Sequence, residues 1–225
     1  MNDKDFLFAD VIDTICSANW RGLDRKELST VAWSYYFFSV QFRENLLVAR
    51  TLYPDDEKLQ HLAREEMDTD NLSPWPGVAE RGEKMNHDEF MRRTLQLCPL
   101  DPESQKVVDR AGEVYLRKVR QVDPDARAVS IASYEDGGLE RVFTAFLQAA
   151  DWDSDTLRAF RHFVTEHIRF DSNEDEGHGA LARHLKPDDR ILPLWSAFRD
   201  LLWETVPALA GHTLNRQAEA QEVAA

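Results

Sequence analysis

The sequence predicts an all-α protein, a single-domain bundle of seven to eight helices, from three observations. Apolar residues recur with helical spacing through most of the chain, and no segment alternates as a half-buried strand would. The 225 residues include only nine Gly and nine Pro, few for an all-β protein. The connections between predicted helices are short, as in bundles. We expect a helical domain over residues 1–211 and a flexible C-terminal tail over 212–225.

The first predicted helices follow from their apolar residues and from chain breakers. Residues 28–53 are apolar nearly all round, which indicates a central buried helix that ends at Pro54. Residues 55–67 form a shorter amphipathic pattern. The stretch SPWPG at 73–77 then interrupts the helical pattern, because proline fixes φ and removes a backbone donor.

Capping signals place the later helices. Asn86 with Glu89 resembles a capping pair and predicts a helix to about residue 97. Asp-Pro pairs at 101–102 and 123–124 open helices that run to about 122 and, across an interruption at Gly137 and Gly138, to 150. The stretch DWDSD caps a long helix from about 154 to 185. The last helix begins at Asp188 or Asp189.

The composition excludes several functional classes. The net charge of −14, without a basic stripe, argues against a nucleic-acid partner. No apolar run is long enough to cross a membrane, and the acidic start is unlike a signal peptide, so we expect a cytoplasmic protein. Cys16 and Cys98 are too few and too isolated for a disulfide framework or a zinc ribbon.

The stretch HIRFDSNEDEGHGAL at 167–181 carries the strongest functional signal. With His167 as reference, Asp171 lies at about +40°, Glu174 at about −20° and His178 at about +20° around one helix. This stripe also holds Phe160 and other apolar residues, so it faces the core. Buried carboxylates must be paired, protonated or bound to metal.

The simplest alternative for this stripe is a core histidine that bonds an aspartate one turn away. Gly177 and Gly179 flank His178 and can bend the helix, which would change the bearing of His178.

Three other helices each offer an inward polar residue. Glu66 lies within about 40° of two leucines, with Asp70 one turn on as a companion. Glu135 falls within an apolar stripe, if the glycine pair after it does not rotate the helix. His87 shares a face with apolar residues, although a histidine at a helix start is as readily a surface or capping residue.

Taken in order, these residues resemble the ligands of the heme-oxygenase-like diiron oxidases, all-α proteins that bind two irons and activate O2. The stretches LQHLAREEM, HDEFMRRTL, ASYEDGG and FRHFVTEHIRFD resemble that family's ligand segments, and the likeness covers about residues 30 to 185. The resemblance implies a metal-ligand set, which is Glu66, His87, Glu135, His167, Asp171 and His178.

The chain departs from the family pattern in two places. About twenty residues separate Glu66 from His87, where relatives have a shorter gap. His178 follows Asp171 by seven residues instead of three, and Glu174 stands at the usual final position. The choice between Glu174 and His178 as the last ligand therefore stays open.

The resemblance implies a non-heme diiron oxidase or oxygenase with two Fe2+ ions, or Mn, and O2 as co-substrate. Its substrate would be a small organic molecule such as an amino acid, an amine or a fatty acid, and a homodimer is one option for its assembly. The aromatic residues expected to line the substrate pocket are Trp33, Tyr36, Phe37 and Phe163. Two alternatives are a metal-free binding or cofactor-processing protein of the same fold, and an acidic protein-interaction module.

Overall fold

The computed structural model describes residues 7–97, 99–171 and 177–210, and only the backbone of Asp171. Over these residues it contains ten α-helices, four 3-10 helices and no β-strand, so the predicted all-α class is confirmed. The predicted tail over 212–225 lies outside the described residues. The helices are α1 Phe8–Cys16, α2 Arg25–Leu52, α3 Glu57–Met67, α4 His87–Gln96, α5 Pro102–Arg120, α6 Pro124–Glu135, α7 Gly138–Phe146, α8 Asp155–Asp171, α9 His178–Ala182 and α10 Leu192–Thr205.

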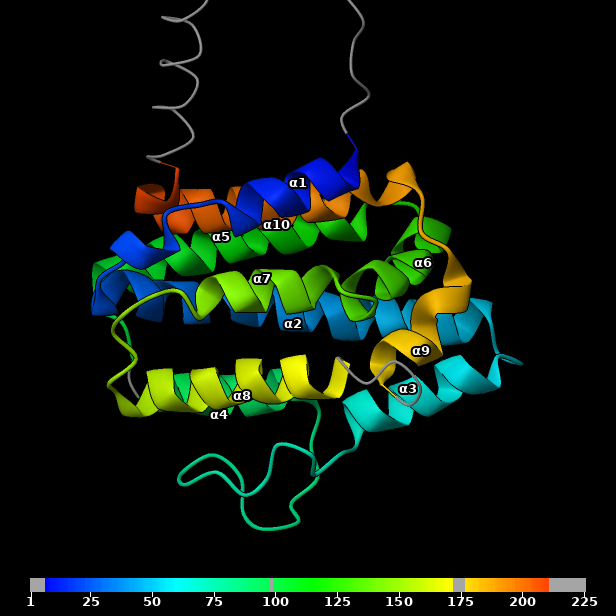
Figure 1. The fold of residues 1–225 in the computed structure, drawn as a ribbon, viewed down its shortest axis with the longest axis horizontal. Helices are drawn as coiled ribbons and strands as arrows, with labels where there is room; N and C mark the ends of the chain where they lie inside the picture. Colours follow the sequence, from blue (N-terminus) through cyan, green and yellow to red (C-terminus); the bar gives the residue numbers. More distant parts are fainter. Residues whose placement is uncertain (1–6, 98, 172–176, 211–225) are drawn as a thin grey trace, which may run out of the picture.

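The helix α2 is the centre of the bundle, as its sequence predicts. It contacts α3, α4, α5, α6, α8 and α10, and its buried residues lie on most of its circumference. In Figure 1, α1, α5 and α10 lie above it and α3, α4, α8 and α9 below it. Asp24 caps its first turn by accepting from the backbone N–H of Glu27, whose side chain accepts in return from Asp24.

The long helix predicted over 154–185 is wrong, because it is divided into α8 and α9. α8 ends at Asp171, and Gly177 is extended (φ −71°, ψ 166°) before α9 begins at His178. A Cβ on Gly179 would lie 2.9 Å from the carbonyl oxygen of Glu135. Glycine at this position therefore lets α9 approach the end of α6 closely.

The number of helices also exceeds the prediction of seven to eight. The described residues include α1, which the sequence pattern does not predict. The interruption predicted at the glycine pair is confirmed: Gly137 has φ +91°, which ends α6 and lets α7 begin in a new direction.

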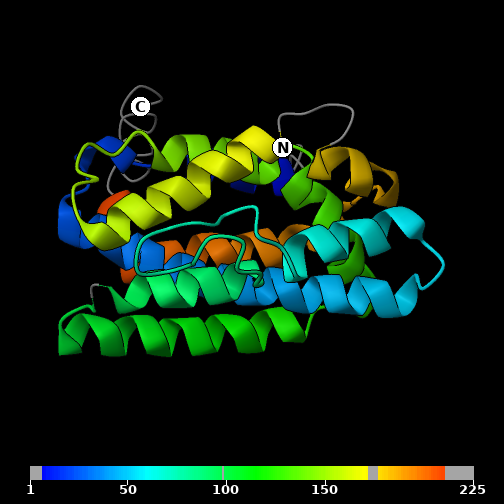
Figure 2. The ribbon, with the colours of Figure 1, turned by 90° about the horizontal axis from the view of Figure 1, so that it is seen from below.

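The connection between α3 and α4, residues 68–86, lies across the face formed by α4 and α8. Figure 2 shows this connection between the two helices. Thr69 and Met85 pair through two backbone hydrogen bonds of 3.2 and 2.9 Å, which close the segment at its base. Trp75 stacks on His162 of α8, with 4.4 Å between the ring centroids. This contact holds the segment against α8, the helix that carries the predicted ligand His167.

None of the helices in the described part of the chain combines the length and the apolar character needed to cross a bilayer.

Candidate metal centre

Five predicted ligand residues from five helices meet in the interior of the bundle. Their side chains are buried, with between 3 and 7% of each residue exposed. Glu66 and His87 lie on the buried faces of α3 and α4, and Glu135 ends α6, which is buried on all sides, so packing of these helices in the bundle carries the polar groups inward. The five residues are Glu66 on α3, His87 on α4, Glu135 on α6, His167 on α8 and His178 on α9.

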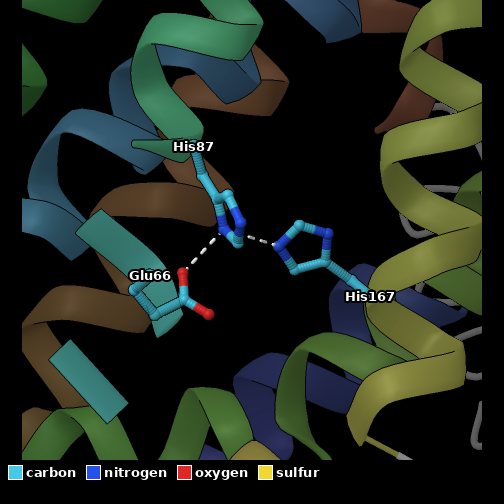
Figure 3. Close-up of side chains that lie close together, drawn as sticks. All are labelled: Glu66, His87 and His167. Atoms are coloured by element: carbon cyan, nitrogen blue, oxygen red, sulfur yellow. Dashed lines mark hydrogen bonds and ion pairs between the residues drawn. The ribbon is translucent and has the colours of Figure 1, made fainter. Parts of the chain in front are cut away.

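The first group is a triad of Glu66, His87 and His167 (Figure 3). Nδ1 of His87 lies 2.6 Å from Oε2 of Glu66 and 3.0 Å from Nε2 of His167. The three side chains point toward one another from α3, α4 and α8, as Figure 3 shows.

Each of these two histidines has one ring nitrogen that faces the triad and one, the outer nitrogen, that faces away from it. The hydrogen bond of the outer nitrogen determines which nitrogen carries the lone pair. Nδ1 of His167 lies 2.7 Å from the carbonyl oxygen of Phe163, which can only accept, so this nitrogen carries the proton. Nε2 of His87 lies 3.3 Å from Oδ1 of Asn71 and donates to it. The neutral form of each imidazole therefore presents a lone pair to the interior.

The second group is a triad of Glu66, Glu135 and His178. Nδ1 of His178 lies 2.9 Å from Oε1 of Glu66 and 3.3 Å from Oε2 of Glu135. Glu66 thus belongs to both triads and turns Oε2 toward the first and Oε1 toward the second. A carboxylate placed in this way can join two cations.

Burial and neighbouring charges shift the pKa values of these groups in different directions. Burial would raise the pKa of Glu66, but His87 and His178 hold it well below its usual range. Burial raises the pKa of Glu135, and the charge of Glu66 adds to the effect. Burial lowers the pKa of His167 to about 3, and His87 acts in the same direction. Burial would lower the pKa of His178, but Glu66 and Glu135 raise it well above its usual value.

The donor set fits a cation in each triad. In the first, two imidazole lone pairs and a carboxylate oxygen face one another, and a single proton on His87 could satisfy only one of its two neighbours. In the second, Oε1 of Glu66 and Oε2 of Glu135 are buried and accept no well-aligned hydrogen bond from the described residues. Within each triad the ligand atoms lie within 4.8 Å of one another. Imidazole and carboxylate ligands suit iron, manganese and zinc.

A cavity of about 20 Å³ adjoins both triads. This is room for about one water-sized molecule beside the ligands. Arg43 and Asp88, which form an ion pair of 2.9 Å, are 32% and 12% exposed, so they mark the side where the cavity approaches solvent. The apolar wall consists of Tyr35, Phe42, Leu46, Met67, Leu139 and Phe163.

The structure corrects the predicted pocket lining. Phe163 lines the cavity, but Trp33, Tyr36 and Phe37 do not. Phe37 packs on Gly112 of α5, where an added Cβ would lie 2.3 Å from its ring. The lining residues of α2 are Tyr35, Ser39, Phe42, Arg43 and Leu46. These positions form one helical stripe, which periodicity can identify, whereas aromatic character alone selected three residues that do not line this cavity.

The remaining predicted ligands are Asp70, Asp171 and the alternate Glu174. Asp70 is exposed, because it follows the end of α3 and lies in the connecting segment. The side chain of Asp171 and the whole of Glu174 lie outside the described residues. The outer partner Asn71 had no signal in the sequence, because it belongs to an irregular segment.

No protein-family model, curated protein or solved structure matches this chain. The resemblance to heme-oxygenase-like diiron oxidases therefore stays a prediction from the sequence.

Replacing the shared carboxylate tests the centre directly. We expect the parent protein to bind two Mn2+ ions per chain and Glu66→Gln to weaken binding at both positions by about 100-fold or more, since even an outer partner of a ligand is worth about 10–100-fold. Isothermal titration with Mn2+ measures both. The matched control is Glu65→Gln, because Glu65 is a half-buried neighbour of Glu66 that belongs to neither triad. Unchanged binding by Glu66→Gln would contradict the assignment.

The low pKa of His167 predicts how stability depends on pH. The unfolded chain protonates this imidazole below about 6.5, whereas the folded protein keeps it neutral down to about 3, so stability falls as the pH decreases between these values. Between pH 7 and 5, with a chelator present, the parent should lose about 2 kcal/mol more free energy of unfolding than His167→Gln. Urea unfolding at both pH values measures the difference. Equal losses would show that the imidazole is not held neutral.

Proposed function

We propose that this chain holds two divalent metal ions, iron or manganese, and uses them in the O2-dependent oxidation of a small organic molecule. The observation that carries the proposal is the position of Glu66, which turns one oxygen to each of two buried triads. The first ion would be held by Glu66, His87 and His167, and the second by Glu66, Glu135 and His178.

The charges and the protons of the site support two cations. Two ions carry four positive charges, which would offset the buried carboxylates of Glu66 and Glu135. Binding at the second triad requires His178 to give up the proton that the two carboxylates now stabilise. Bound iron would supply the one-electron chemistry through which O2 reacts with organic molecules.

The protein's own residues would arrange and protect this chemistry. The apolar wall around the cavity keeps bulk water from the ligands and strengthens electrostatic interactions there. A cavity of about 20 Å³ admits a molecule of the size of O2, whereas an organic substrate must displace side chains of the wall.

Arg43 and Asp88 are suited to hold the polar end of that substrate. Nε of Arg43 donates to Oδ2 of Asp88, whereas Oδ1 of Asp88 is buried and accepts no hydrogen bond from the described residues. Both residues line the cavity together with the ligands. We infer a substrate with a charged or polar head bound at this pair and an apolar body directed along the wall.

Exposure of the ferrous protein to O2 tests the redox proposal. Protein loaded anaerobically with Fe2+ should consume O2 on mixing, with oxidation of the iron and a transient visible absorption band. Glu135→Ala and His167→Ala should lose both the iron and the O2 uptake, whereas His61→Ala, which alters an exposed histidine of α3, should keep both. Ferrous parent protein that is stable in air would contradict the proposal, and preferential retention of zinc would favour a non-redox metal site.

A ligand panel tests the assignment of Arg43. A hydrophobic amino acid, an alkylamine or an alkylcarboxylate should raise the melting temperature of the metal-loaded parent. Arg43→Met should bind that compound about tenfold more weakly, the effect of losing a hydrogen bond to a charged group, with unchanged metal content. Arg50→Met alters an exposed arginine of the same helix and serves as control. Equal stabilisation of parent and Arg43→Met would contradict the role.

A further inference from the structure

The two histidines of the first triad find the hydrogen-bond partners of their outer nitrogens in different parts of the chain. His167 lies well inside α8, so its Nδ1 reaches the carbonyl oxygen of Phe163 one turn earlier in the same helix. His87 is the first residue of α4, so its own helix provides no carbonyl oxygen one turn earlier. Any fixed acceptor for its outer nitrogen must come from another part of the chain.

The segment 68–86 provides that acceptor. Oδ1 of Asn71 lies 3.3 Å from Nε2 of His87. This bond leaves Nδ1 of His87 to face Glu66 and His167. The backbone N–H of Asn71 donates to the hydroxyl oxygen of Thr69, 3.2 Å away, which helps to hold the residue in place.

Contacts with α4 and α8, the helices that carry the two histidines of the triad, hold the rest of the segment in position. Nε2 of His162, on α8, lies 3.1 Å from the carbonyl oxygen of Leu72, the residue after Asn71. Arg93, on α4, donates to the carbonyl oxygen of Val78 at 3.1 Å and to Glu83 at 2.7 Å. The segment therefore places the Asn71 amide relative to α4 and α8 together.

We propose that Asn71 is a positioning residue that selects which nitrogen of His87 binds metal. It would thereby strengthen metal binding at the first triad and leave the affinity of the second unchanged. This inference rests on the proposed two-metal function. The segment 68–86 then has a definite role: it supplies the acceptor that a histidine at a helix start lacks. The second triad shares Glu66 but does not contain His87, the residue that Asn71 holds, so its affinity should not respond.

Two substitutions of Asn71 separate positioning from folding. Asn71→Leu keeps a similar volume and removes the acceptor, and Asn71→Asp supplies a stronger one. Mn2+ titration should show one of the two positions weakened about 10–100-fold in Asn71→Leu, the other unchanged, and both retained in Asn71→Asp. Ser73→Ala is the matched control, because it removes hydrogen bonds within the same segment, to Asp70 and from Gly82, and none to His87.

The hydrogen bond between His87 and Asn71 gives a readout independent of metal. Imidazole 1H–15N spectra of the metal-free parent should show an Nε2–H of His87 that exchanges slowly with water because Asn71 accepts from it, and Asn71→Leu should lose this protection. The inference is overturned if Asn71→Leu binds both ions as the parent does, keeps the protected Nε2–H of His87, or weakens both positions equally. A parent protein that binds fewer than two ions would instead contradict the proposed function, while the Nε2–H signal would still decide the role of Asn71.

Discussion

The structure depends most on one buried carboxylate. Glu66 is almost fully removed from water and lies within 3 Å of imidazole nitrogens on two other helices, His87 and His178. A carboxylate in that position is tolerable only if positive charge compensates it. In the metal-free protein, protons shared with the imidazoles of His87 and His178 compensate the charge of Glu66. Two bound cations would take over this role. The same constraint explains why five helices bring polar groups to one point of an otherwise apolar core.

Much of this arrangement could be predicted from the sequence, because helical periodicity fixes which side chains share a face. Glu66, Glu135 and His167 lie among apolar neighbours, and burying those faces brought the polar groups inward. His178 reached the site by a different path from the one expected: α8 ends before it, and the short helix α9 packs against the end of α6. The bearing calculated along a continuous helix placed His178 in the interior, where it lies, but for an incorrect reason.

The rest of the site depends on tertiary contacts that no periodicity encodes. The close approach of α9 to α6 follows from the single glycine at 179. Asn71 belongs to an irregular segment whose position follows from contacts such as that of Trp75 with His162. The pocket was assigned to aromatic residues by their chemistry, although the stripe that contains Tyr35 faces the cavity. A segment without a repeating pattern, residues 68–86, therefore supplies the hydrogen-bond partner of His87.

The most direct test of the central claim is anomalous X-ray diffraction from crystals of the protein equilibrated with Mn2+. We expect two anomalous peaks, one on each side of the Glu66 carboxylate: one near His87 and His167, the other near Glu135 and His178. A single peak, or none near Glu66, would show that this carboxylate does not join two metal ions.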